Sequence, residues 1–174
     1  MEMGVPGLAP SRIGTEAEIE ALKHGVAQFY PMLEGYPVLS EEASRFVKNF
    51  MDVDIRPEGI IPTVGAMQAS YVAFMALTEC HKGKDTILFI DPGFPVQKTQ
   101  LEVIGKPYQT FDIYEYREEK LEAKLREYLD RGNIAGIVYS NPNNPSWVCL
   151  TDFELQVIGK LATEYDTIIL EDLD

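Results

Sequence analysis

Two short polar segments, each of which follows an apolar run, are the parts of this chain best suited to chemistry. The first is Asn141–Trp147, which reads Asn-Pro-Asn-Asn-Pro-Ser-Trp, and the second is Glu171-Asp172-Leu173-Asp174. An asparagine held by flanking prolines offers a rigid amide donor, which suits a phenolic oxygen. A carboxylate beyond a buried strand could keep a pyridine nitrogen protonated. The alternatives are a plain Asx turn and a solvated strand end.

Two earlier segments also combine a turn with groups that could contact a ligand. Thr63–Ala69 places Gly65 before an apolar helix, whose N-terminal N–H groups could hold a phosphate. Asp91–Pro95 holds Phe94 between two prolines, where the ring could stack on a flat ligand. The alternatives are an ordinary strand-to-helix turn in the first segment and a core side chain in the second.

The apolar periodicity predicts alternating strands and helices that would position these segments. The predicted strands are Thr86–Ile90, Tyr108–Ile113, Ile134–Tyr139 and Thr167–Leu170. Two helices are predicted to start after the N-caps Thr15 and Ser40. Four more are predicted over Ala66–Thr78, Val96–Ile104, Glu118–Leu129 and Asp152–Leu161. Strands separated by helices favour an α/β fold of three αβα layers around a mostly parallel sheet. Ligands in such folds bind beyond the carboxyl ends of the strands.

The composition narrows the function. The chain has 174 residues, of which 45% are hydrophobic, and a formal net charge of -13. The acidity argues against nucleic acid or an anionic membrane surface as partner. Cys80 and Cys149 show no metal-ligand or disulfide spacing, so no metal site is predicted and a reducing cytoplasm is the expected location. No apolar stretch is long enough to span a bilayer.

The segments occur in an order that resembles the class I/II aminotransferase family, the fold-type I pyridoxal-phosphate-dependent enzymes. Five stretches, spread over nearly the whole chain, are similar to motifs of that family. They are Tyr30-Pro31 with Glu34–Pro37, Gly65–Ala69, Pro92–Pro95, Asn141–Ser146 and Ile168–Asp174. The ordered series is far more specific than any one motif.

The resemblance implies a pyridoxal 5'-phosphate site in which Gly65 forms the phosphate turn. The amides of Ala66 and Met67 would hold the cofactor phosphate. Phe94 would stack on the pyridine ring, where the family more often has tyrosine or tryptophan.

Four further roles follow from the same resemblance. Asn144 would donate to the phenolic oxygen of the cofactor, and Asp172 would pair with the protonated ring nitrogen. Tyr30 would reach the phosphate of a neighbouring subunit, which implies a homodimer with shared sites. Gly4 matches, weakly, a loop that lines the substrate carboxylate.

Two departures from the family pattern affect these expectations. Trp147 stands where the family usually has glycine, and a bulky side chain is expected to demand ordinary backbone angles there. The Schiff-base lysine and the substrate-binding arginine of the family lie beyond the last residue of this chain. None of the nine lysines is in the expected Ser-x-x-Lys-like context, so no catalytic residue is assigned.

We therefore expect a large-domain fragment that is inactive alone. Its predicted parts are an N-terminal arm and substrate loop (1–14), a helical segment (15–58) and a partial cofactor-binding domain (59–174), without the small domain. The full-length protein is predicted to be an aminotransferase of amino-acid metabolism that acts on an amino acid and a 2-oxo acid. A carbon–sulfur lyase, an amino-acid decarboxylase, a ligand-sensing domain of a regulator and a purely structural fragment are the alternatives.

Overall fold

The second of two compact units in the chain is built around a parallel β-sheet. The computed structural model describes residues 7–173, and the chain divides into residues 1–62 and 63–174. The sheet of the second unit has four parallel strands in the order β2-β1-β3-β4. The strands are β1 (Thr86–Asp91), β2 (Tyr108–Asp112), β3 (Ile134–Ser140) and β4 (Ile168–Asp172).

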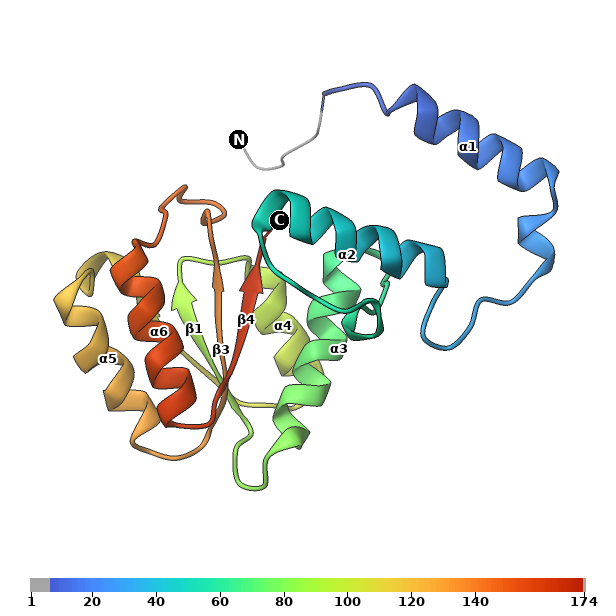
Figure 1. Ribbon diagram of the computed structural model, residues 1–174. Helices are drawn as coiled ribbons and strands as arrows, with labels where there is room; N and C mark the ends of the chain where they lie inside the picture. The colour runs from blue at the N-terminus through green and yellow to red at the C-terminus, as the bar shows by residue number, and fades with distance from the viewer. Residues whose placement is uncertain (1–6, 174) are drawn as a thin grey trace. The chain divides into compact units, whose positions relative to one another are not determined.

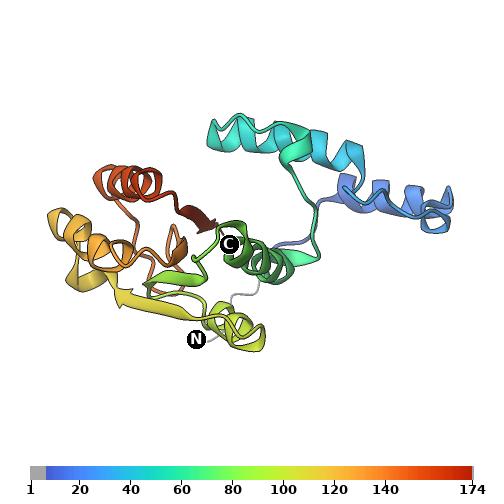
Figure 2. The same cartoon turned by 90° about the horizontal axis from the view of Figure 1, so that it is seen from below.

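Helices cover both faces of this sheet (Figures 1 and 2). One face carries α3 (Gly65–Cys80) and α4 (Pro95–Val103), and the other carries α5 (Glu119–Leu129) and α6 (Asp152–Glu164). A short 3-10 helix, η3 (Ile113–Glu115), follows β2. The predicted α/β fold with three αβα layers is confirmed.

Alternating side chains of β1 show how the sequence produces these layers. Leu88 and Ile90 lie in the apolar cluster with the buried leucines of α5, whereas Ile87 and Phe89 lie in the cluster with Phe74 of α3. Successive side chains of a strand point to opposite faces, so a strand covered on both faces must be apolar throughout. All of β3 is likewise buried.

The ends of most elements in this unit agree with the sequence predictions to within one to three residues. The capping box at the start of α6 is present, with Thr151 accepting from the Glu154 amide and Glu154 accepting from the Thr151 amide. Gly132, which follows α5, has a φ of 76° and donates its amide to Leu129 O at 3.0 Å.

The first unit consists of α1 (Arg12–Lys23), η1 (Val26–Gln28), α2 (Pro37–Met51) and η2 (Pro57–Gly59). Both helix starts predicted here were wrong. The cap of α1 is Ser11 rather than Thr15, so the helix begins inside the predicted arm. The second helix begins at Pro37, and Ser40 lies within its first turn.

The described part of the first unit, residues 7–62, buries no hydrophobic side chain. The rings of Phe46 and Phe50 on α2, for example, have centroids 4.6 Å apart and remain exposed. Within residues 7–173, no helix combines the length and the apolar character that crossing a membrane requires.

Candidate functional site

The carboxyl ends of the four strands form one edge of the sheet, and an acidic or hydroxyl side chain closes each strand. The register pairs Asp91 of β1 with Asp112 of β2, and Ser140 of β3 with Asp172 of β4. In Figure 1 the first turn of α3 lies at the same end, toward which the arrowheads point. The fold therefore collects the predicted site segments of the second unit at one edge.

The first turn of α3 presents backbone N–H groups to solvent. Gly65, Ala66 and Met67 are all exposed, and a helix leaves its first four N–H groups without partners inside the helix. Gly65 has a φ of 78°, which any other residue adopts only at a cost. The amide of Val64, just before the helix, donates to Gln68 Oε1 at 2.5 Å. Exposed N–H groups at a helix N-terminus are of the kind that bind phosphate.

Phe94 is exposed and lies at the start of α4. It occupies the N-cap position, and Pro95 follows at the first helical position. The ring is 37% exposed and belongs to neither apolar cluster of the unit. Because Phe94 does not fill the core, one of its surfaces can contact a ligand.

The Asn-Pro-Asn-Asn-Pro-Ser loop is held by Asn143, which the sequence analysis did not single out. Asn143 is buried, and its Nδ2 donates to Pro92 O at 2.5 Å and to Ser140 Oγ at 3.1 Å. Its Oδ1 accepts from Ser146 Oγ at 2.6 Å. Asn144 is exposed, and its backbone amide donates to Ser140 Oγ at 3.2 Å. The loop thus fixes one asparagine inside and presents the next one outside.

Asp172 is half-buried at the end of β4. Gln97 Nε2 on α4 donates to Asp172 Oδ2 at 2.8 Å, and the Asn141 amide donates to Asp172 O at 3.2 Å. Gln97 was not among the residues predicted from the sequence to belong to the site. A signal for it was available, because Gln97 and Gln100 share a helical face with Leu101, where burial is expected.

The neighbouring acid, Asp91, is in a different electrostatic environment. Lys98 Nζ lies 2.6 Å from Asp91 Oδ2 and 5.6 Å from the centroid of the Phe89 ring. Both side chains of the ion pair are largely buried. This ion pair balances the charge of Asp91, which makes Asp91 a poor partner for a cationic ligand atom.

Tyr139, which precedes Ser140 on β3, is not suited to proton transfer near neutral pH. Burial, and to a lesser extent the adjacent charge of Glu171, raises the pKa of Tyr139 to about 12. A phenol with this pKa stays neutral under physiological conditions.

The remaining predicted contacts lie elsewhere. Tyr30 belongs to the first unit and is fully exposed. Gly4 lies outside the described residues. The Glu34–Pro37 segment forms a turn before α2, in which Gly35 has a φ of 95°. A Cβ at Gly35 would come within 2.9 Å of the Pro62 ring, so both the backbone angle and the space require glycine.

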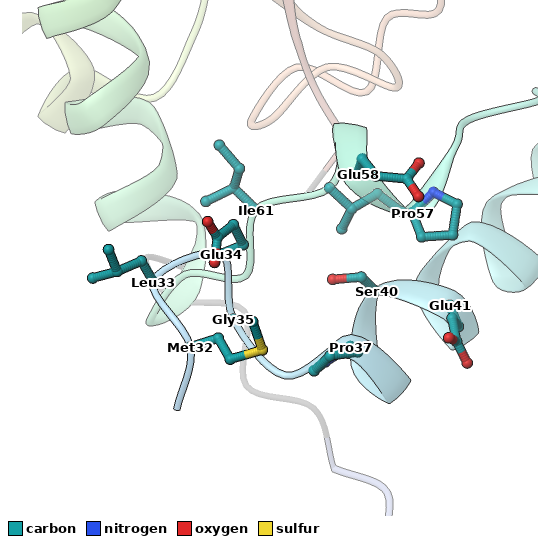
Figure 3. Close-up of a pocket in the computed structure, with 11 residues that line it drawn as sticks. Met32, Leu33, Glu34, Gly35, Pro37, Ser40, Glu41, Pro57, Glu58 and Ile61 are labelled. Carbon is teal, nitrogen blue, oxygen red and sulfur yellow. The ribbon is translucent and has the colours of Figure 1, made fainter. Parts of the chain in front are cut away.

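This turn borders a cavity of about 470 Å³ within the first unit (Figure 3). The start of α2 and the residues around η2 complete its wall, which is mostly apolar and includes Met32, Leu33, Pro37, Pro57 and Ile61. None of the predicted cofactor-binding residues lines it.

The expectation about Trp147 was wrong. Trp147 has a φ of 62°, in the left-handed region that glycine adopts readily, and its side chain is 84% exposed. Its amide donates to Asn143 O at 2.7 Å, which closes the loop around Asn143. The loop therefore keeps a glycine-like backbone despite the bulky side chain.

The left-handed angle at residue 147 predicts a stability difference between two substitutions. We expect Trp147→Gly to be more stable to urea than Trp147→Ala by about 1 kcal/mol, because only glycine adopts this angle without steric cost. Both variants remove the indole, so their difference isolates the backbone term. Equal unfolding midpoints would show that residue 147 carries no such strain.

The groups at the sheet edge match a ligand with an anion at one end and a basic aromatic nitrogen at the other. The exposed amides of α3 suit the anion, Phe94 suits the ring face and Asp172 suits the nitrogen. Pyridoxal 5'-phosphate has these features. Among residues 7–173, no three His, Cys, Asp or Glu side chains are grouped so that they could hold a metal ion.

Similarity to known proteins covers nearly the whole chain. A sequence model of one family, aminotransferase class I and II, matches residues 5–173. The chain is 30% identical over 173 residues to an aspartate aminotransferase of Pyrococcus horikoshii, covering 98% of this chain and 42% of that protein. It is 23% identical to an asparagine–oxo-acid transaminase of Streptococcus mutans, of which it covers 43%.

Solved structures give the same result for the fold. An alanine aminotransferase from Pyrococcus furiosus matches with a TM-score of 0.79 and 26% identity, over 95% of this chain and 41% of that one. An aspartate aminotransferase from Thermus thermophilus with maleate matches with a TM-score of 0.83 and 22% identity, over 98% and 44%. The chain spans less than half the length of these relatives.

Proposed function

Because the chain belongs to the class I and II aminotransferase family, we propose that the complete gene product is a pyridoxal-phosphate-dependent aminotransferase. By complete gene product we mean the longest polypeptide that the gene encodes around these residues. It would move an amino group between an amino acid and a 2-oxo acid. The observation that carries the proposal is the shared sheet edge, where a half-buried acid and an exposed helix N-terminus occur together.

Each candidate residue has a defined task in this proposal. The amides of Ala66 and Met67 bind the phosphate, and Gly65 supplies the backbone angle that begins the turn. Phe94 supports the ring face. Asn144 donates to the phenolic oxygen of the ring.

Asp172 provides the electrostatic part of the proposed mechanism. Its negative charge favours a proton on the ring nitrogen. When bound, pyridoxal phosphate supplies an electron-withdrawing ring that accepts the electron pair released at the substrate α-carbon. The Asp172 charge maintains that property by holding the nitrogen in its protonated form.

The same proposal assigns roles to the other segments of the chain and to a second subunit. Residues 59–174 would form part of the cofactor-binding domain, 15–58 would lead into it, and 1–14 would line the substrate, with Gly4 near its carboxylate. Tyr30 is fully exposed, which suits a contact with the phosphate held by a second subunit of a homodimer. The protein would act in amino-acid metabolism in the cytoplasm.

The complete gene product and the 174-residue chain should differ in activity. We expect transamination from the complete gene product and none from the 174 residues alone, because no lysine here lies in the sequence context of the Schiff-base lysine. Lys98, at the sheet edge, is in an ion pair with Asp91. Both proteins would be assayed with pyridoxal phosphate and a panel of amino acids and 2-oxo acids. Turnover by the 174 residues would contradict the expectation, and inactivity of the cofactor-loaded complete gene product would contradict the proposed function.

A further inference from the structure

Two buried glutamines lie one helical turn apart on α4. Gln97 is 6% exposed and Gln100 is 9% exposed, and both share the inward face with Leu101. A buried side-chain amide costs free energy unless hydrogen bonds satisfy it. The partners of these two amides therefore show what the buried face of α4 holds in place.

Gln97 contacts the acid proposed to face the ring nitrogen. Its Nε2 donates to Asp172 Oδ2 at 2.8 Å. The bond joins α4 to the end of β4 across 75 sequence positions, so it is a tertiary contact. Hydrogen bonds to a carboxylate are stronger than neutral ones, and this one orients the Asp172 side chain.

Gln100 contacts the other end of the proposed cofactor site. Its Oε1 accepts from Ser70 Oγ at 2.9 Å, and its Nε2 donates to Met67 O at 2.8 Å. Met67 belongs to the first turn of α3, whose amides are proposed to bind the phosphate. Gln100 thus connects α4 to the phosphate turn as Gln97 connects it to Asp172.

The neutral amide of Gln97 binds the Asp172 carboxylate without cancelling its negative charge. The next residue on α4, Lys98, forms an ion pair with Asp91 at the neighbouring strand end. An amide at position 97 donates a hydrogen bond without adding a positive charge. Gln97 and Lys98 thus bind two acids of one sheet edge, the first through a neutral amide donor and the second through a positive charge.

We propose that Gln97 and Gln100 are positioning residues, and that α4 sets the spacing between the phosphate turn and the acid that faces the ring nitrogen. This inference rests on the proposed function. Three residues of α-helix rise about 4.5 Å, so the spacing depends on a short rigid segment. Gln97 acts on the nitrogen end of the cofactor through Asp172, and Gln100 acts on the phosphate end through α3.

The test compares two ligands that differ in one ring atom. Binding of pyridoxal phosphate and of 1-deazapyridoxal phosphate, in which carbon replaces the ring nitrogen, would be measured on the complete gene product. Gln97→Met should weaken pyridoxal phosphate binding about 10-fold and leave binding of the analogue within about 2-fold, because a hydrogen bond to a charged group is lost. Gln97→Lys should reduce the preference for pyridoxal phosphate over the analogue, because it places a positive charge beside Asp172.

Gln100→Met should weaken both ligands to the same degree, because both carry the phosphate. In an Asp172→Asn background, Gln97→Met should not change further the preference for pyridoxal phosphate over the deaza analogue. Gln156→Met, at an exposed position of α6, is the matched control and should change neither affinity.

Equal weakening of both ligands by Gln97→Met, or no weakening of either, would overturn the assignment of Gln97. If Gln100→Met reduced only the preference for pyridoxal phosphate over the deaza analogue, the assignment of Gln100 would be overturned. Failure of the unsubstituted protein to bind pyridoxal phosphate would instead overturn the proposed function.

Discussion

Replacing Glu154 by alanine is expected to lower the free energy of unfolding by about 3 kcal/mol. Glu154 is fully buried on α6, and its carboxylate accepts from Arg117 Nε at 2.5 Å and Nη2 at 2.7 Å. It also accepts from the amides of Glu118 and Thr151, each at 2.9 Å. Truncation would leave these donors unsatisfied. The estimate is at the low end for a buried pair because the Arg117 side chain is 31% exposed.

A local backbone feature adds to this expectation. Glu118 has a φ of 53°, an unfavourable angle for a residue with a side chain, and Glu154 binds its amide. The matched control is Glu127→Ala, because Glu127 pairs with Lys124 at a solvent-exposed position. We expect that change to cost less than about 1 kcal/mol. Similar urea midpoints for the two variants would contradict the account of Glu154.

The hydrogen bonds of Glu154 also predict how the stability difference between the unsubstituted protein and Glu154→Ala depends on pH. Burial alone raises the pKa of Glu154, but hydrogen bonds from Arg117 and from the amides of Glu118 and Thr151 outweigh it, so the pKa is lowered. A lowered pKa in the folded state stabilises the protein above the unfolded-state pKa, about 4.3 for glutamate, and this contribution is lost as the pH falls through the folded-state pKa. The stability gap to Glu154→Ala should therefore narrow in acid.

Asp172→Ala in the complete gene product is expected to lower kcat for transamination on the order of 10²–10³-fold, because a fixed charge aimed at the reacting ring is removed. Asp172→Asn should be similarly impaired, since it keeps the shape and loses the charge. The measurement is steady-state kinetics together with the absorbance spectrum of the bound cofactor.

Asp112→Ala is the control for the Asp172 variants. Asp112 ends β2 at the same edge of the sheet and is exposed, and its Oδ1 accepts from the Tyr114 amide. Its loss should leave kcat within about 2-fold, as expected for a surface change away from the reacting group. An Asp172→Ala variant with the spectrum and rate of the unsubstituted protein would refute the role of Asp172.

The elements of the second unit could be predicted because their signals are local. Ile87–Ile90 is apolar at every position, as expected for a strand covered on both faces, and Thr151 with Glu154 forms a complete capping box. The starts of α1 and α2 could not be placed in this way. Ser11 competes with Thr15 as a cap, and Pro37 begins a helix before Ser40 does.

The candidate site segments were proposed where a turn adjoins a predicted strand or helix. Asp172 was proposed as an acid at a strand end and the α3 turn as a glycine before an apolar helix, and both lie at the carboxyl edge of the sheet. The hydrogen bonds of Asn143 and Gln97 could not be predicted from local motifs, because their partners, Pro92 and Asp172, are distant in the sequence. The backbone angle at Trp147 was misjudged because the loop hydrogen bonds, rather than the side chain, determine it.

We propose that this sheet edge serves the transfer of an amino group. The most direct test supplies the complete gene product with pyridoxal phosphate, a ¹⁵N-labelled amino acid and an unlabelled 2-oxo acid, and follows the label by mass spectrometry. We expect the label to appear in the amino acid made from the 2-oxo acid, in step with loss of the labelled substrate. Release of the label as ammonia would contradict the proposed transamination. So would decarboxylation of the substrate to carbon dioxide and an amine that keeps the label.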